Sequence, residues 1–204
     1  ASNIAAVILE PVQGSTGVIV PPVGYLQKIR EICDKHGILL IFDEVITGFG
    51  RLAANFGADR FGVKPDMITF AKAITNGVIP MGGVIVRQDI YDAIVNVGGQ
   101  EQAIEFFHGF TYSGHPIATA AAHASLDIFE SDGIIEKTKV LEKLLEAGVH
   151  SYKGMNGVMD IRNCGVSAGI DLEPIAGKPY RYGGIVGHAN LPLAIKQALQ
   201  ETAQ

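Results

Sequence analysis

The sequence has little charge of either sign, few cysteines and no long hydrophobic run. Charged residues make up 18% of the 204-residue chain, and the formal net charge is −5. A chain with this balance has no excess of lysine and arginine to hold a phosphate backbone, which argues against nucleic acid as its main partner. No apolar run approaches the roughly 18 residues that a membrane span needs, and no signal peptide is recognisable. We therefore expect neither a nucleic-acid nor a membrane partner.

Cysteine is nearly absent as well. Cys33 and Cys164 stand isolated, and their spacing matches no metal-binding motif. Such cysteines are typical of a reducing compartment, so we predict a cytoplasmic protein. His108 and His115 lie in one loop without a carboxylate partner, and we interpret them as structural residues, so no metal site is predicted.

Apolar residues and glycine are what the chain has in quantity. Hydrophobic residues make up 48% of it, and there are 25 glycines. This composition is typical of a compact α/β protein with many loops, and the length allows one large domain or two small ones. The chain runs almost at once from Ala-Ser-Asn into an apolar stretch, which resembles the middle of a longer protein.

Strand and helix patterns alternate in the first half. Apolar positions after Tyr25 are spaced for one face of a helix, with Gly37 as its stop signal. The helix lies between two short apolar runs, which predicts a right-handed βαβ unit with parallel strands. The strands predicted in this half cover residues 4–9, 38–42, 67–73 and 84–86.

The second half has a different character. Pro116 starts an alanine-rich helix that ends near Phe129, and residues 134–152 form an amphipathic helix. A hairpin is predicted around Asn163-Cys164-Gly165, and a last helix over residues 190–202. We place the domain boundary at the alanine-rich helix, between residues 1–118 and 119–204.

Two polar residues follow apolar strands. Asp43 ends the run Ile38–Phe42, which reads as a strand buried on both faces, and Lys72 ends the next run. Ligands of open α/β sheets bind at the carboxyl ends of the strands. On this pattern alone Asp43 could equally cap a turn or pair with an arginine.

The chemistry of this pair points to one cofactor. Burial at a strand end lowers the pKa of a lysine toward the deprotonated form that attacks carbonyls. The resulting Schiff base is the usual anchor of pyridoxal phosphate, and an aspartate usually holds its pyridinium nitrogen. Asp43 and Lys72 would hold opposite sides of that flat molecule.

Four motifs of the chain belong together: Glu10–Gly14, Leu39–Arg51, Pro65–Lys72 and His108–Pro116. In combination they resemble the motifs of the class III pyridoxal-phosphate aminotransferases, and above all of their ω-amino acid–pyruvate (β-alanine–pyruvate) branch. The resemblance is strong over residues 4–130 and weak over 155–180. It implies fold type I: part of a large domain with a mainly parallel sheet and helices on both faces, plus an incomplete C-terminal α/β small domain.

The resemblance also implies roles for single residues. Lys72 would bind the cofactor and move the proton, Asp43 would hold the ring nitrogen, and Val45 would pack on one ring face. Thr111 would bind the phosphate of the neighbouring subunit, which implies a homodimer or a tetramer of dimers with shared active sites. The implied reaction is ping-pong transfer of an amino group from an ω-amino acid or amine to pyruvate, through a pyridoxamine intermediate.

The chain departs from the family pattern in three ways. Ile46 stands where many relatives have a glutamine that bonds the cofactor's ring oxygen. Ser15 stands where ornithine- and GABA-type relatives carry a glutamate, which points away from diamino substrates. Whole members of the family are much longer and contain a phosphate loop that this chain lacks. Their arginine for the substrate carboxylate is only faintly matched by Arg181.

Two other functions stay open. Another pyridoxal enzyme on the same scaffold, such as an aminomutase, a racemase or a different transaminase, would also keep Asp43 and Lys72. An aminomutase or a racemase would need no second keto acid. A non-catalytic fragment is the other possibility, because the phosphate loop is missing.

Overall fold

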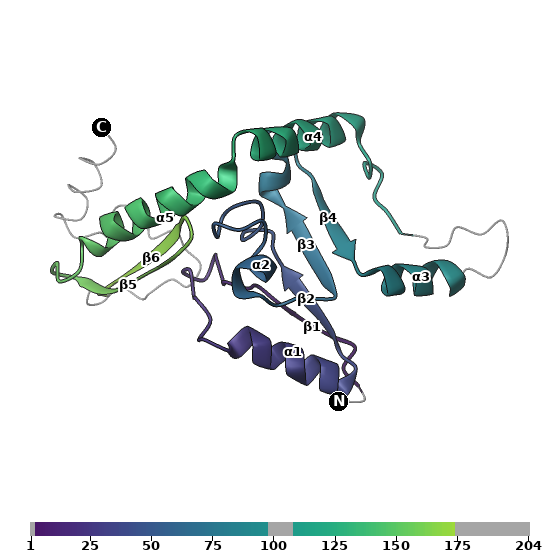
Figure 1. Cartoon of the computed structure of the whole chain (residues 1–204), viewed down its shortest axis with the longest axis horizontal. Coiled ribbons are helices and arrows are strands. Elements are labelled where there is room, and N and C mark those ends of the chain that lie inside the picture. Colours follow the sequence, from purple (N-terminus) through teal and green to yellow (C-terminus); the bar gives the residue numbers. More distant parts are fainter. Residues whose placement is uncertain (1–2, 98–107, 174–204) are drawn as a thin grey trace.

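The computed structural model describes residues 3–97 and 108–173. A four-stranded sheet with the order β1-β2-β3-β4 forms the centre, and a two-stranded hairpin lies beside a long helix (Figure 1). The strands of the central sheet are β1 (Ala6–Leu9), β2 (Leu39–Asp43), β3 (Met67–Ala71) and β4 (Gly82–Val86).

The first three strands of the sheet are parallel, as predicted. β1 and β2 are joined by α1 (Tyr25–His36), which ends at Gly37 with a left-handed φ of 63°. β4 runs antiparallel to β3 and starts two residues before the predicted strand. Gly83 makes that extension possible, because a Cβ there would lie 2.6 Å from the Phe70 ring. The α/β fold with a mainly parallel sheet is therefore confirmed.

One face of the sheet carries the core. Leu40 and Phe42 are completely buried against residues of α1 and of the region of α2 (Gly57–Phe61). Their neighbours in β2 point the other way and are only half-buried, so the prediction that this strand is buried on both faces is wrong within the described residues. On that second face Ile8 is 59% exposed. The alternation arises because α1 and α2 both cover the first face.

Asp66 ties the elements of the sheet together at the start of β3. Its side chain is 4% exposed and accepts hydrogen bonds from the Leu40 amide (2.7 Å) and from Arg30 of α1 (2.9 Å). Arg87, directly after β4, donates to the other carboxylate oxygen. Burial alone would raise the pKa of Asp66, but these bonds outweigh it and hold the pKa below its ordinary value.

We expect Asp66 to make the fold sensitive to acid. A depressed folded pKa means that its stabilisation is complete above the unfolded pKa of about 3.9 and is lost as the pH falls through the folded pKa. Asp66→Asn should lower the free energy of unfolding at pH 7 by about 1.5–3 kcal/mol, because it removes the buried charge that accepts bonds from the Leu40 amide, Arg30 and Arg87. It should also flatten the loss of stability below pH 4.

Urea unfolding at a series of pH values measures this effect. Asp34→Asn is the matched control, since Asp34 also pairs with Arg30 (2.7 Å) but is exposed. Its loss should stay below about 1 kcal/mol. If Asp66→Asn loses stability below pH 4 as steeply as the wild type, Asp66 is not the source of the acid sensitivity.

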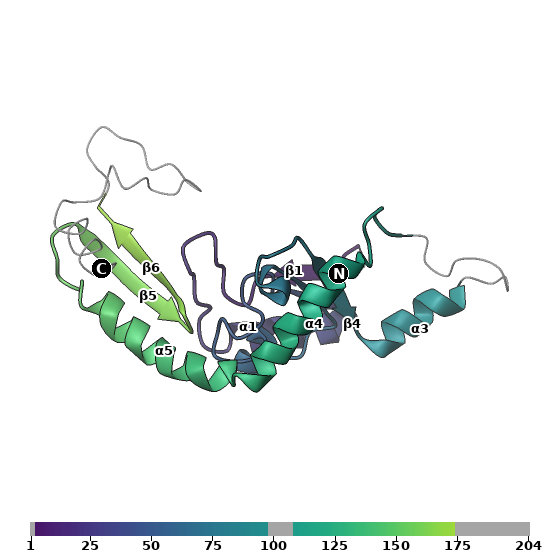
Figure 2. The ribbon, with the colours of Figure 1, turned by 90° about the horizontal axis from the view of Figure 1, so that it is seen from above.

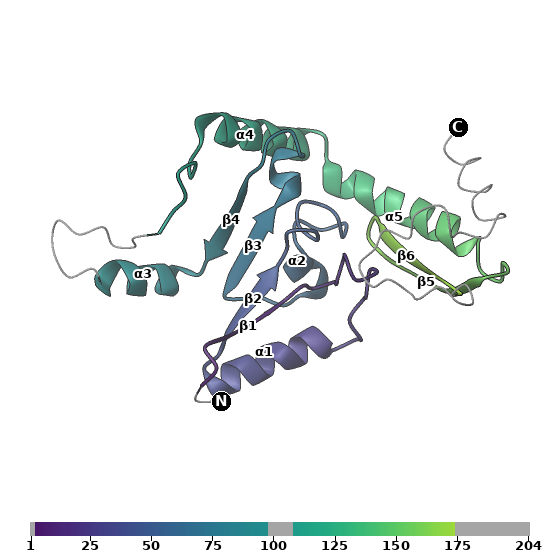
Figure 3. The ribbon, with the colours of Figure 1, turned by 180° about the vertical axis from the view of Figure 1, so that it is seen from behind.

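The remaining helices extend from this body. α3 (Gln88–Val97) stands apart from the sheet (Figure 2). α4 (Pro116–Ser131) lies across the end of β3 and the start of β4 (Figure 1). α4 begins at the predicted proline and packs on η1 (Lys72–Thr75), the short 3₁₀ helix after β3. α5 (Ile134–His150) follows (Figure 3).

The predicted hairpin is confirmed beside α5. It consists of β5 (Val158–Cys164) and β6 (Ser167–Leu172), which pair antiparallel. The last predicted helix, residues 190–202, and Arg181 lie outside the described residues. Within residues 3–97 and 108–173, no helix is long and apolar enough to cross a membrane.

Candidate functional site

The structure brings Asp43 and Lys72 to one edge of the sheet. Asp43 is the last residue of β2, and Lys72 directly follows β3 as the first residue of η1. β2 and β3 are neighbouring parallel strands, and Asp43 pairs in register with Thr69. The prediction that these side chains end separate strands of one sheet is therefore confirmed.

Asp43 is half-buried and has one oxygen engaged. Its Oδ1 accepts a hydrogen bond from the Val45 amide at 3.1 Å, which closes a short turn after the strand. No described residue bonds the other oxygen, and no described arginine pairs with Asp43. The turn-capping alternative thus holds for one oxygen, while the second can still accept a bond from a ligand.

Lys72 is exposed, so the expected burial of this lysine is not found. The strand ends at Ala71, and Lys72 takes a left-handed φ of 51°, where the chain turns into η1. The Lys72 side chain makes no hydrogen bond or ion pair with the described residues. A positive φ at a residue other than glycine is uncommon and is found preferentially at functional sites.

Thr69 adds a polar group that the sequence did not reveal. It is the register neighbour of Asp43, so both side chains stand on the same face of the sheet. Its hydroxyl oxygen is buried and has no hydrogen-bond partner in the described residues. Buried polar groups nearly always have a partner, so this hydroxyl fits a site where a polar ligand completes the bonding.

Glu44 supports the segment that follows Asp43. Its side chain is fully buried and accepts bonds from the Thr47 hydroxyl (2.5 Å) and from the amides of Gly57 (2.6 Å) and Ala58 (2.7 Å). Burial raises the pKa of Glu44 above its ordinary value, although these three bonds oppose the rise. The bonds tie the half-buried Val45 and its neighbours to the start of α2.

Thr111 does not join this group within the chain. It lies in the loop before α4, where the Phe110 amide donates to the Ser113 hydroxyl (2.9 Å) and closes a turn around it. Thr111 is exposed and has no hydrogen bond among the described residues. Phe110 and Tyr112 on either side are also exposed, at 79% and 78%. The tip of this loop, residues 110–112, is therefore exposed to solvent.

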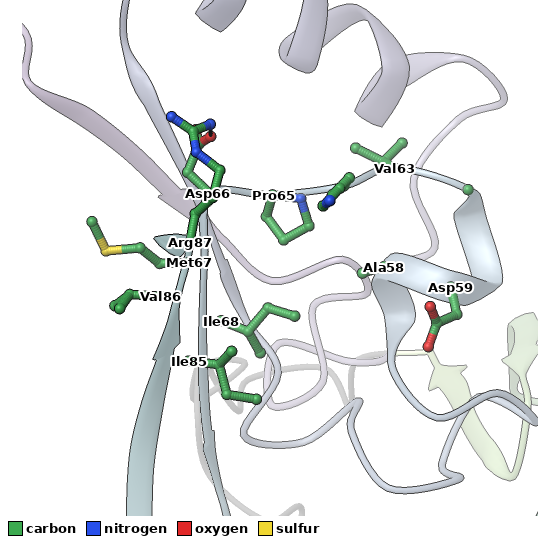
Figure 4. A pocket seen from close by; sticks show the side chains of 12 residues that line it. Ala58, Asp59, Val63, Pro65, Asp66, Met67, Ile68, Ile85, Val86 and Arg87 are labelled. Carbon is green, nitrogen blue, oxygen red and sulfur yellow. Dashed lines mark hydrogen bonds and ion pairs between the residues drawn. The ribbon is translucent and has the colours of Figure 1, made fainter. Parts of the chain in front are cut away.

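A pocket lies at the other end of the sheet. Its volume is about 640 Å³, and it opens between α2 and the strands β3 and β4 (Figure 4). Ile68 and Ile85 line one wall, and Asp66 and Arg87 stand at its upper end, already bonded to each other. This is the amino end of β3, opposite Lys72, and ligands of such sheets bind at the carboxyl end.

Comparisons with known proteins agree with the geometry. Residues 1–186 match the protein family Aminotransferase class-III. The chain is 55% identical over 179 residues to the beta-alanine–pyruvate aminotransferase of Pseudomonas aeruginosa. The aligned region covers 88% of this chain and 40% of that protein. It is 49% identical over 187 residues to the omega-amino acid–pyruvate aminotransferase of Pseudomonas putida, covering 90% of this chain and 42% of that protein.

A solved structure is also similar to this chain in fold. The omega transaminase from Pseudomonas jessenii in complex with PMP superposes with a TM-score of 0.79 at 38% identity. The match covers 83% of this chain and 37% of that one. The chain thus spans about 40% of the length of the relatives it matches.

Proposed function

Because the chain belongs to the class III aminotransferases, we propose that the protein containing it transfers an amino group from an ω-amino acid or amine to pyruvate. The observation that carries this proposal is the placement of Asp43 and Lys72 at neighbouring strand ends. The printed activities of the two relatives, with beta-alanine or an omega-amino acid and pyruvate, support the choice of substrates.

The cofactor that fits these residues is pyridoxal 5'-phosphate. Lys72 would bind it covalently, Asp43 would hold its ring nitrogen through the carboxylate oxygen that has no described partner, and Val45 would pack on one ring face. The Thr69 hydroxyl, which has no partner among residues 3–97 and 108–173, offers a further polar contact at the same edge. When bound, the cofactor supplies an electron sink for the substrate carbon.

The residues of the chain supply the remaining chemistry. The Lys72 amine would take a proton from the substrate carbon and return it on the other side of the substrate nitrogen. The Asp43 carboxylate keeps positive charge on the ring nitrogen, which preserves the electron sink. Glu44 holds the turn after Asp43 in place through its three hydrogen bonds.

The oligomer and the domains are part of the same proposal. Thr111 lies on an outward-facing loop, which suits a phosphate contact with a neighbouring subunit in a homodimer or a tetramer of dimers. Residues 1–118 would belong to the large cofactor-binding domain, and residues 119–204 to the connecting helix and the small domain. Free, buried Cys33 and Cys164 support a cytoplasmic location.

An assay of the complete protein tests the function. With pyridoxal phosphate, β-alanine and pyruvate, we expect alanine to form, and no alanine when either substrate is omitted. Rearrangement of the amino acid without any keto acid would identify an aminomutase instead. Absence of turnover with every amine donor would support the non-catalytic reading.

A further inference from the structure

A loop near the cofactor edge is held by an arginine of the hairpin. Gln13 and Ile19 close this loop with two backbone bonds of 3.1 and 2.9 Å. Arg162 of β5 donates from Nε to the Gly17 carbonyl oxygen at 2.8 Å. Asp171 of β6 binds the other side of the guanidinium with two bonds of 2.7 and 3.0 Å. A bidentate pair of this kind fixes the direction in which the arginine points.

The loop and the hairpin are in close backbone contact. A Cβ at Gly169 would lie 2.3 Å from the Gly17 carbonyl oxygen, and a Cβ at Gly17 would lie 2.8 Å from Arg162 Nη2. Only glycine allows this approach at either position. The position of the loop therefore depends on both strands of the hairpin, through Gly169 of β6 and Arg162 of β5.

The opposite side of the loop contacts the segment that follows Asp43. A Cβ at Gly14 would lie 2.8 Å from the Ile46 side chain, so the loop backbone packs directly on Ile46. The Gly14 amide also donates to Glu10 at 2.9 Å. The loop is thus placed between Ile46, three residues after Asp43, and Arg162.

The hairpin itself is anchored independently of Arg162. Cys164 is buried in a cluster with Val12, Val18 and Leu52. The Val166 amide donates to the Arg51 carbonyl oxygen at 2.9 Å, next to this cluster. Loss of the arginine side chain therefore leaves the hairpin docked. Because Val18 of the loop belongs to the same cluster, the loss loosens only the part of the loop around Gly17.

We propose that Arg162 is a positioning residue, which holds the loop of residues 13–19 against Ile46 and so shapes the wall of the Asp43–Lys72 site. The inference rests on the proposed function, because it concerns the same site. Among the described residues Arg162 bonds to Gly17, Asp160 and Asp171 and to neither Asp43 nor Lys72, so its loss should weaken substrate binding more than the chemical steps.

The test compares Arg162→Ala with the complete wild-type holoenzyme. We expect the KM for the amino donor to rise by up to about a hundredfold, the limit set by the charged hydrogen bond that holds the loop, with kcat within about threefold. Backbone hydrogen exchange should accelerate in the peptide covering residues 13–19 and stay unchanged in β2. Arg162→Lys should restore only part of the effect, since lysine cannot form the bidentate pair.

Arg60→Ala is the matched control. Arg60 of α2 makes a bidentate pair with Glu142 of α5 (2.8 and 3.2 Å), which also joins the two halves but is not bonded to the loop. This variant should lower the melting temperature without changing the KM or the exchange of residues 13–19.

Two results would overturn the proposal. One is wild-type KM and wild-type exchange of residues 13–19 in Arg162→Ala. The other is a uniform acceleration of exchange in both peptides, which would mark a general structural role. If the wild-type protein shows no transamination, the proposed function fails, and the exchange of residues 13–19 alone decides whether Arg162 holds the loop.

Discussion

Lys72→Ala is expected to abolish turnover while leaving the fold largely intact. The Lys72 side chain is exposed and makes no described hydrogen bond, so its removal takes away no packing. The proposed reaction, in contrast, needs its amine twice, for the covalent bond to the cofactor and for the proton transfer. Loss of both should reduce the rate by at least about four orders of magnitude.

Two measurements check the assignment of Lys72. The wild-type protein should be yellow, and borohydride should fix the cofactor on the peptide that contains Lys72. Lys64→Ala is the control, because Lys64 is also exposed but lies at the other end of β3. It should retain colour and activity. Recovery of the cofactor on any other lysine would refute the role of Lys72.

Asp43→Asn should show an equally clear separation of activity from stability. The asparagine keeps the oxygen that accepts the Val45 amide, so the turn and β2 should form as before. It removes the negative charge that keeps the ring nitrogen protonated, and the substrate carbon then loses its electron sink. We expect the half-reaction with an amine donor to slow by about three orders of magnitude or more, with a nearly unchanged melting temperature.

The turn-capping alternative predicts the opposite result, since asparagine replaces aspartate at turns and caps almost without cost. Asp59 provides the comparison, because its carboxylate only caps α2, with the Phe56 amide at 3.2 Å. Asp59→Asn should leave the half-reaction unaffected. If Asp43→Asn reacts at the wild-type rate as well, Asp43 is a capping residue and not a cofactor ligand.

Much of the fold can be predicted from the sequence because its signals are local. Short apolar runs and one helical face between them predict parallel β1 and β2, since βαβ crossovers have a fixed hand. Parallel strands end at the same edge of a sheet, so Asp43 and Lys72, which each follow such a strand, are expected at one edge. Pro116 likewise marks the start of α4, because proline suits the first turn of a helix.

Contacts between residues distant in the chain were decided only by the tertiary structure. The sequence pattern cannot show that Glu44 binds amides 13 and 14 residues later, or that Arg162 reaches Gly17 across 145 positions. The apolar residues on both sides of Lys72 predict a buried side chain. The side chain is exposed instead, because the strand ends and the backbone turns at this residue. Periodicity reports which face of an element is apolar, whereas the partner of a polar group depends on how the elements pack.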